Sequence, residues 1–471
     1  MISNTINYFY SSICVYVLVS LYTGFTSIAT TSYRASSTMS WITISFCLGI
    51  YGVLKEFRPS ESYVVPYLLG PRMNFTEEQV NNEILPIGIY ASMISMIFVA
   101  LTTDWLRYKI VMVIQALCGV GVYALLSLCT SFTSIVVVEI LYGIFDATEV
   151  AYSTYIYSVV NVKYYQKVTS YTRAAFLIGR FFSGFLAQIF ISTKLVDTYQ
   201  LNFLTLGSLM AATIWALVLP SIKNNKLTSE NYNMKVTSPK TVTQNVHEHD
   251  VSMEKNIENK HITWKYIRSM CNEYTNMYVL KWSFWVITST CCFQQVTNYI
   301  QSLWESLSCN DCPHSVCKST SEWNGAVDAV YTIISTFVTF FCGSIKFNLN
   351  KYGNTLIVIT SIIHFISLLT SAVCSSIYLA YINYIIYCTI FQGMLTIASS
   401  EIAKSVNRDK HGFVFGVNTL LATTLQSLAV FFMNTIGWSS SPKISFQYYA
   451  IFCLLIGMCY LFITTRQLFK K

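Results

Sequence analysis

Long apolar stretches separated by short polar segments run through the chain from residue 39 to residue 465. Charges, Pro, Gly and Asn bound each stretch, and each is close to the roughly 20 residues that a helix needs to cross a bilayer. The pattern predicts twelve membrane-spanning helices, at residues 39–55, 84–103, 110–129, 135–160, 170–192, 201–219, 281–303, 325–345, 354–374, 377–403, 413–436 and 446–465.

A polar segment at residues 221–262 separates the first six stretches from the last six. It is rich in Asn, Lys, Ser, Thr and Glu and lacks apolar periodicity, which is typical of a flexible linker. We therefore expect an all-α integral membrane protein with a six-helix half at 39–220, a cytosolic linker at 221–280, a second half at 281–465 and a cytosolic tail at 466–471. This organisation is typical of the twelve-helix major facilitator superfamily fold, in which the substrate binds between the halves.

Residues 8–30 form a further apolar segment, for which three interpretations are open: a signal peptide, a thirteenth span or a wrongly assigned start of the coding sequence. No Lys or Arg precedes Arg34, which weakens the signal-peptide interpretation because that signal begins with a basic region. We favour a membrane-associated N-terminal extension at 1–38.

The composition agrees with a membrane protein, since 54% of the residues are hydrophobic and only 11% are charged, against about 25% charged in soluble domains. The chain has no GxSxG, HExxH or P-loop motif, and none of its six His forms a ligand pair within one helix. This argues against a membrane enzyme and against an ATP-driven pump. We expect no metal and no cofactor.

The distribution of Lys and Arg predicts the orientation of the helices. If the N-terminus of the 39–55 helix lies in the cytosol, cytosolic segments hold 21 Lys and Arg, nine of them in 221–281, and the opposite side holds six, including Lys55 and Arg58. The net charge of +8 then lies on the inner membrane face, so nucleic acid is a poor partner. The glycosylation sequon at Asn74 falls in an outer loop, as this orientation requires.

A second outer loop, at 304–323, holds Cys309, Cys312 and Cys317 beside His314. The outside of the cell is oxidising, so a disulfide that staples the loop is favoured over a metal site. Three Cys leave one unpaired, and the sequence does not say which.

Three carboxylates stand in the apolar stretch 135–160, at Glu139, Asp146 and Glu149. Their spacing of i, i+7 and i+10 puts them, with Tyr142, within an arc of roughly 80° on one helical face. A charge in the bilayer core costs about 2.5–3.5 kcal/mol on insertion scales. The acidic face is therefore predicted to line a wet cavity or meet a partner, and acids with a tyrosine suit a cationic solute.

Two bases in the next helix, Arg173 and Arg180, also lie at i, i+7. We expect the pairs Glu149–Arg173 and Asp146–Arg180 across the two helices. Glu139 then has no basic partner left in its half, which favours a cation or proton site over a structural ion pair.

The second half is poorer in charge. In the seventh helix, Gln294, Asn298 and Gln301 share one face, and Trp304 follows. Their amides are expected either to form hydrogen bonds between helices or to hydrogen-bond a polar ring of the substrate. Asp328, about one turn inside the eighth helix, is expected to pair with a base, line the cavity or titrate during transport. Glu401 and Lys404 are expected to form a gate or a surface pair.

The cytosolic turn 103–109 between the second and third helices carries Asp104 at one helix end and Arg107 near the start of the next. We expect this acid and this base to form a latch between conformations of the protein.

Several segments together resemble the reduced folate carrier and thiamine transporter family. The resemblance runs in order from about residue 40 to 465 and rests on segments 58–63, 66–71, 74–76, 82–84, 103–109, 139–143, 149–152, 155–160, 171–175, 323–329 and 413–419. It implies the twelve-helix facilitator fold and transport of a vitamin, folate in one branch and thiamine in the other.

Three positions separate the branches. Where the folate carriers have an Arg and, in the eleventh helix, a Lys, this chain has Glu149 and Gln426. The tenth-helix Arg of the folate carriers has no counterpart here, because no base occurs between Tyr387 and Gln392. Folates are dianions and thiamine is a cation, so the resemblance implies a plasma-membrane thiamine transporter that works by alternating access without ATP and with coupling to protons. The alternatives are a carrier of folate or another organic anion bound by Arg173 and Arg180, and a substrate-binding sensor that does not transport.

The resemblance also implies residue roles. Glu139 would face the aminopyrimidine or the positive ring, and Tyr142 would stack on it, while Gln294 or Asn298 would close the pocket from the other half. Glu61 and Asp104 would serve structure or gating. The expected substrate-binding and gating residues are Glu139, Tyr142, Glu149, Tyr152, Gln294, Asn298 and Trp304, with Glu61, Asp104, Arg107, Asp146, Arg173, Arg180 and Asp328. The chain departs from the thiamine branch at Leu85 and Gly88, where thiamine carriers have aromatic residues, so a related cation or a thiamine ester is also a candidate substrate.

Overall fold

The computed structural model describes residues 41–106, 108–149, 152, 165–219, 272–308, 323–344, 349–406, 410–436 and 441–468. The predicted N-terminal extension, Arg107, the three Cys of the 304–323 loop and most of the predicted linker lie outside these residues, as does the side chain of Asp104.

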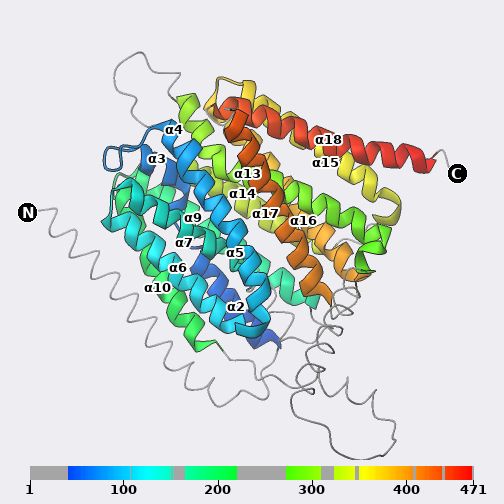
Figure 1. Cartoon of the computed structure of the whole chain (residues 1–471), viewed down its shortest axis with the longest axis horizontal. Coiled ribbons are helices and arrows are strands. Elements are labelled where there is room, and N and C mark those ends of the chain that lie inside the picture. Colours follow the sequence, from blue (N-terminus) through cyan, green and yellow to red (C-terminus); the bar gives the residue numbers. More distant parts are fainter. Residues whose placement is uncertain are drawn as a thin grey trace, which may run out of the picture.

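Six long helices form the N-terminal half of the described chain (Figure 1). They are α2 (Trp41–Glu56), α5 (Leu85–Leu106), α6 (Tyr108–Leu128), α7 (Phe132–Ala147), α9 (Tyr165–Ser192) and α10 (Thr198–Val218). Short helical segments fill the loop from α2 to α5: η1 (Glu61–Tyr63), α3 (Val64–Leu69), α4 (Glu77–Gln79) and the π-helical turn η2 (Val80–Ile84).

The C-terminal half opens with a short turn and continues with six long helices. They are η4 (Asn272–Thr275), α13 (Met277–Ser308), α14 (Asn324–Ser344), α15 (Leu349–Val373), α16 (Ile377–Ser405), α17 (His411–Ile436) and α18 (Pro442–Leu468). Each of the twelve predicted spans is therefore matched by one long helix, which confirms the predicted fold class.

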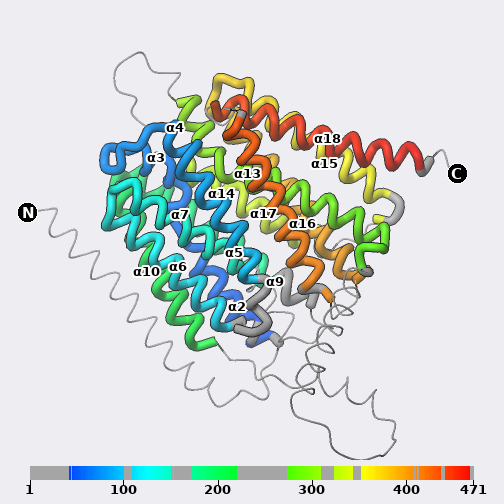
Figure 2. The backbone as a smooth tube through the Cα atoms, viewed as in Figure 1, coloured from blue at the N-terminus to red at the C-terminus, as the bar shows by residue number. Residues whose placement is uncertain are grey.

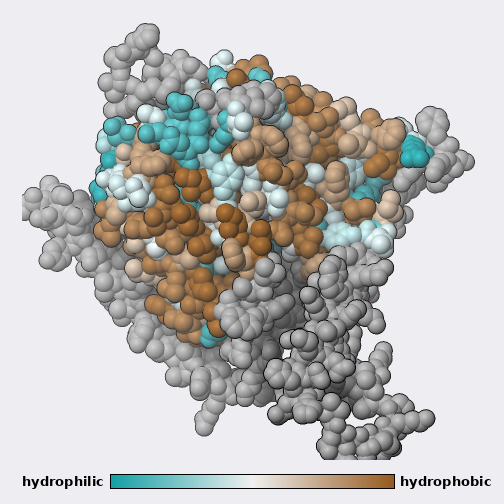
Figure 3. All heavy atoms as spheres, viewed as in Figure 1, coloured by the Kyte–Doolittle hydropathy of each residue, from teal (hydrophilic) through white to brown (hydrophobic). Residues whose placement is uncertain are grey.

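Nine of the described helices are long and apolar enough to cross a membrane on length and composition alone. The other three long helices are α2, α7 and α13, which carry many of the polar and charged residues of the candidate site. Large apolar side chains are exposed on the outer surface of the helices, as a surface in contact with lipid requires; Phe98, Phe340 and Phe462 are 63%, 67% and 68% exposed. Apolar side chains also dominate the face drawn in Figure 3 over α5 and α17, whereas polar ones gather at the end that carries α3 and α4.

The two halves lie side by side, with the N-terminal half in blue to green and the C-terminal half in yellow-green to red (Figure 2). Two pairs of long helices join them, α9 with α14 and α5 with α17, and the short segments α3 and η1 also contact α13 and α14. Glycines allow the α9–α14 approach, because a Cβ at Gly184 would lie 2.7 Å from the Gly325 carbonyl oxygen and a Cβ at Gly325 would lie 2.7 Å from the Gly184 carbonyl oxygen.

The fourth predicted helix differs from its prediction of one continuous span, because α7 ends at Ala147 and Thr148 forms a turn. The Thr148 hydroxyl donates to the carbonyls of Ile144 and Phe145, and the Gln115 side-chain amide also donates to the Phe145 carbonyl. These side chains bond the backbone groups at the helix end. Glu149 lies just past this turn.

Candidate functional site

A cavity of about 540 Å³ lies between the two halves, within the size range of small-molecule sites. Side chains from α2, α5, α7 and α9 line one wall, and side chains from α13, α14, α16 and α17 line the other. Among the described residues, six carboxylates and three guanidinium groups face this space: Glu56, Glu61, Glu139, Asp146, Glu149 and Asp328, with Arg58, Arg173 and Arg180.

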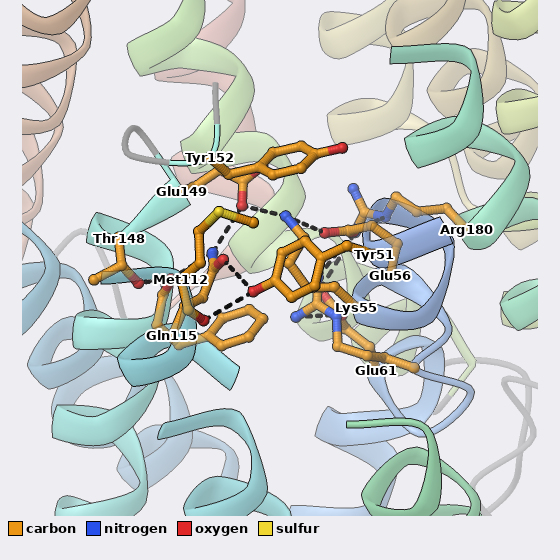
Figure 4. Close-up of polar contacts among 12 residues, drawn as sticks. Tyr51, Lys55, Glu56, Glu61, Met112, Gln115, Thr148, Glu149, Tyr152 and Arg180 are labelled. Carbon is orange, nitrogen blue, oxygen red and sulfur yellow. Dashed lines mark hydrogen bonds and ion pairs between the residues drawn. The ribbon is translucent and has the colours of Figure 1, made fainter. Parts of the chain in front are cut away.

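Lys55 lies behind the cavity wall and connects two of its acids. Its ammonium group is 3.2 Å from the Glu56 carboxylate and forms a close ion pair with Glu149 (Figure 4). The Lys55 side chain is 0% exposed and that of Glu149 is 32% exposed, so the acid is the member that reaches the cavity. The Gln115 amide donates to Glu149 over 2.8 Å and accepts from the Tyr51 hydroxyl over 2.9 Å.

The remaining acids of this cluster pair with arginines. Arg58 lies 3.1 Å from Glu56 and 2.9 Å from Glu61, and Arg180 approaches the same two acids at 3.7 and 3.3 Å. Lys55, Arg58 and Arg180 therefore neutralise Glu56, Glu61 and Glu149. We call these six residues the buried ion-pair network.

The network corrects two predictions. Lys55 and Arg58, counted among the outer-loop bases, are buried because α2 continues to Glu56 and the chain then turns inward into η1. The predicted pairs Glu149–Arg173 and Asp146–Arg180 are wrong, because Lys55 pairs with Glu149 and Arg180 pairs with Glu56 and Glu61.

The other predicted partners bind neutral groups. Asp146 accepts a hydrogen bond of 2.6 Å from the Ser92 hydroxyl, and Arg173 donates to the Gln392 side-chain oxygen over 2.8 Å. The latter bond links α9 to α16 across the cavity.

Three lining acids, Glu139, Asp146 and Asp328, form no ion pair with any residue in the part of the chain that the structure describes. With Lys55 included, six acids face four bases, so the fully ionised site carries a charge of −2. A low-dielectric cavity with excess negative charge attracts a cation.

Tyr142 and Tyr152 are held in different ways. The Tyr142 ring stacks on Phe145 at 6.1 Å between ring centroids, and its hydroxyl donates to Glu61 over 3.4 Å. Tyr152 lies over the Lys55 ammonium at 4.9 Å from its ring centroid and donates to the Leu48 carbonyl over 3.0 Å. Both tyrosines line the cavity, and Tyr152 also packs against the buried ion-pair network.

The C-terminal half supplies amides and an aromatic wall. Gln294 and Asn298 line the cavity, and Trp304, only 1% exposed, is fixed edge-on against Tyr381 and Tyr384.

Phe293 and Phe391 stack face to face with centroids 4.0 Å apart and both line the cavity. Sequence reasoning missed this pair, because two phenylalanines on different apolar helices carry no local signal of a shared surface.

One end of the cavity is closed by hydrogen bonds between the halves. The Ser62 hydroxyl donates to Asp328 over 2.5 Å, and Gln301 accepts from the Val65 amide over 3.1 Å and donates to the Glu61 carbonyl over 2.8 Å. We call these five residues the loop-side interface. Asp328 thus lines the cavity and bonds to the other half, and Gln301 likewise bonds between the halves, while the role of Asp328 in transport stays a prediction.

The other predicted sites lie away from the cavity. Asn74 is exposed in the loop between α3 and α4 with a positive φ of 54°, and Thr76 of its sequon caps α4 by accepting from the Gln79 amide; glycosylation stays a prediction. Glu401 and Lys404 form an ion pair of 2.7 Å in which Lys404 is 61% exposed, while Glu401 is buried and accepts a hydrogen bond from the Tyr278 hydroxyl.

The family model described as reduced folate carrier matches residues 39–442. The chain belongs to the reduced folate carrier family. It is 31% identical to a Caenorhabditis elegans protein named Folate transporter 1, covering 92% of this chain and 94% of that protein. It is also 31% identical to human Thiamine transporter 1, covering 92% of this chain and 91% of that protein.

Solved structures support the fold of this reduced folate carrier family member. A POT family transporter in complex with a thioalcohol-conjugated peptide aligns with a TM-score of 0.61 at 10% identity, over 90% of this chain and 96% of that one. A nucleoside transporter aligns with a TM-score of 0.57 at 13% identity, over 89% of this chain and 99% of that one. The chain is thus a membrane-spanning transporter of a vitamin transporter family and not an enzyme.

Proposed function

We propose that this family member carries thiamine, or a closely related organic cation, across the plasma membrane without ATP. The observation that carries the proposal is the charge of the site, in which six acids meet four bases and Glu139 has no ion pair with a described residue. An isolated carboxylate is costly in a membrane protein's interior and becomes stable when a cation or a proton neutralises it.

In this proposal the cargo cation takes the place of the missing counter-ion at Glu139. Tyr142 presents an aromatic face from α7, backed by Phe145, and Phe293 presents another from α13. Gln294 and Asn298 supply amides for the polar edge of a heteroaromatic ring. A flat cationic ring fits this combination, since aromatic faces attract cations and amides bind ring nitrogens.

Transport in this proposal proceeds by alternating access. In this proposal the loop-side interface closes one end, so entry of cargo from that side requires the Ser62–Asp328 and Gln301 bonds to break. Glu139 takes a proton when cargo leaves, which couples transport to protons. From the Lys and Arg distribution we place the loop-side interface outside the cell and the C-terminus in the cytosol.

Replacement of Glu139 with Gln tests the proposal, because it keeps the shape of the side chain and removes its charge. In cells with equal surface protein, we expect uptake of labelled thiamine to be lost in E139Q. A matched control at an exposed acid of α4, Glu78→Gln, is expected to keep uptake. Normal uptake by E139Q would reject Glu139 as the cation site.

A second candidate, transport of folate or another organic anion, has one observation in its favour. Arg173 lies in the cavity, where its guanidinium donates to Gln392. Block of thiamine uptake by excess folate, and its relief in Arg173→Gln, would favour this candidate. We expect neither result.

A further inference from the structure

Lys281 stands on an exposed apolar face near the start of α13. Met277, Leu280 and Phe284 lie there at i, i+3 and i+7, and all three are exposed apolar side chains, as on a face in contact with lipid. Lys281 lies four residues after Met277, so it shares this face. It is also the first residue of the span predicted at 281–303, which puts it at the boundary of the apolar membrane core.

The Lys281 side chain is folded back against the protein. Its ammonium group lies over two rings, 4.8 Å from the centroid of Tyr278 and 4.9 Å from that of Trp282. A Cβ at Gly353, near the start of α15, would lie 3.5 Å from the same nitrogen, so the α15 backbone closes a third side. Lysines at membrane boundaries commonly extend toward water, whereas this ammonium group is held in place between two helices.

The positive charge of Lys281 is not neutralised by an ion pair with any residue in the described ranges. The acid that acts on it electrostatically is Glu401 of α16. That carboxylate instead pairs with Lys404 over 2.7 Å and accepts a hydrogen bond from the Tyr278 hydroxyl. Two lysines thus share one acid, and one positive charge is left over at this end of the C-terminal half.

We propose that Lys281, held by Tyr278 and Trp282, binds the phosphate of an anionic phospholipid. Basic pockets between transmembrane helices on the cytosolic side bind such head groups, and the Lys and Arg distribution places this end of α13 on that side. The head group neutralises the charge left over, and an acyl chain lies over Phe284, about one helical turn deeper in the membrane. The exposed apolar face favours a lipid over a soluble anion, because a soluble anion has no chain to cover that face.

The proposed lipid site lies on the same helix as much of the C-terminal cavity wall. Beyond Phe284, α13 carries Phe293, Gln294 and Asn298 into the cavity. A lipid bound at the start of α13 adds a contact that holds this helix in place. Its binding does not depend on the cargo and can be measured without transport, so it is tested separately from the proposed function.

Lipid binding to the purified full-length protein tests the proposal. Delipidated protein in detergent is titrated with dioleoyl phosphatidylserine or with the neutral dioleoyl phosphatidylcholine, and native mass spectrometry measures the bound lipid. We expect the wild type to prefer phosphatidylserine and Lys281→Gln to bind it about five-fold more weakly, the effect of one basic residue near an anionic head group. Lys281→Arg keeps the charge and is expected to keep the binding.

The matched control is Arg466→Gln, at an exposed base in the last turn of α18. R466Q removes one positive charge from the same half but leaves Lys281 and its two rings intact, so we expect wild-type binding of phosphatidylserine. An equal loss in K281Q and R466Q would show general attraction to a basic surface and would overturn the site, as would full binding by K281Q. The Tm in phosphatidylcholine is expected to be the same for all variants, which shows that K281Q is folded.

A cross-link in the wild-type protein locates the lipid independently of any variant. Phosphatidylserine with a photoactivatable diazirine in its acyl chain is expected to label the segment of α13 that holds Leu280 and Phe284, and excess unlabelled phosphatidylserine is expected to prevent this. Labelling confined to other helices would contradict the proposal. Inorganic phosphate and glycerophosphoserine, which lack acyl chains, are expected not to compete at the same concentration. Competition by either would show a site for soluble anions and would overturn lipid recognition.

Discussion

The Ser62 hydroxyl on the N-terminal half donates a 2.5 Å hydrogen bond to Asp328 on the C-terminal half. Ser62 is the neighbour of Glu61, which belongs to the buried ion-pair network. The contact between the halves and the charges of the N-terminal wall are therefore one residue apart in the chain. A change in the charge around Glu61 is therefore expected to act on the Ser62–Asp328 contact between the halves through the adjacent residue.

A cross-link at this contact is expected to stop transport. In the double variant Ser62→Cys/Asp328→Cys, mild oxidation joins the halves at the loop side, and we expect thiamine uptake to fall to background and to return after reduction. The two single variants under the same oxidation serve as controls. Full uptake by the fully cross-linked protein would contradict a requirement for this interface to open.

The ion pair of Lys55 predicts an asymmetric effect on stability. Lys55→Met leaves Glu149 without its cation, whereas Glu56 keeps Arg58, and breaking such a buried pair costs about 3–5 kcal/mol. We expect a clear fall in the Tm of the detergent-purified protein. The double variant K55M/E149Q removes the charge left behind and is expected to recover part of the loss; a double variant less stable than K55M would contradict the pairing.

The crossing of α9 and α14 predicts a requirement for glycine. A Cβ at Gly184 would lie 2.7 Å from the Gly325 carbonyl oxygen and 2.9 Å from the Ala329 amide nitrogen, both backbone atoms. We expect Gly184→Ala to destabilise the protein by about 1–3 kcal/mol, as overpacking does. Thermal unfolding measures this, and Gly207→Ala, which meets no neighbour within 4 Å, is expected to have the wild-type Tm.

The stacked pair Phe293–Phe391 predicts an aromatic contribution to affinity. Phe293→Leu keeps an apolar side chain and removes the ring, and aromatic stacking contributes about 0.5–1.5 kcal/mol. We expect the KM for thiamine to rise about two- to ten-fold, and Phe293→Tyr to stay close to wild type. Phe340→Leu, on the exposed surface, is the control. An F293L variant with wild-type KM would exclude a stacking role.

The fold followed from the sequence because membrane spans are a local property. Each of the twelve helices has its own apolar stretch, and the bilayer fixes its length. The break at Thr148 did not follow, because the apolar pattern runs on through it. At the break the side chains of Thr148 and Gln115 donate to carbonyls near the end of α7, Gln115 from the neighbouring helix α6.

The site could be predicted only in part, because many of its contacts join residues that lie far apart in the sequence. The helical spacing of Glu139 and Asp146 places both on one face of α7, and both line the cavity. The partner of Glu149 could not be predicted, because Lys55 stands 94 residues away at the end of another helix, where it resembled a loop charge. The cluster of four charges in residues 55–61 was the available signal.

The most direct test of the account is uptake of labelled thiamine into cells that express this chain, with excess unlabelled thiamine or folate as competitors. The account predicts saturable uptake that thiamine blocks, that folate leaves intact and that E139Q abolishes. Absence of thiamine uptake with the protein confirmed at the surface, or uptake blocked by folate, would contradict it.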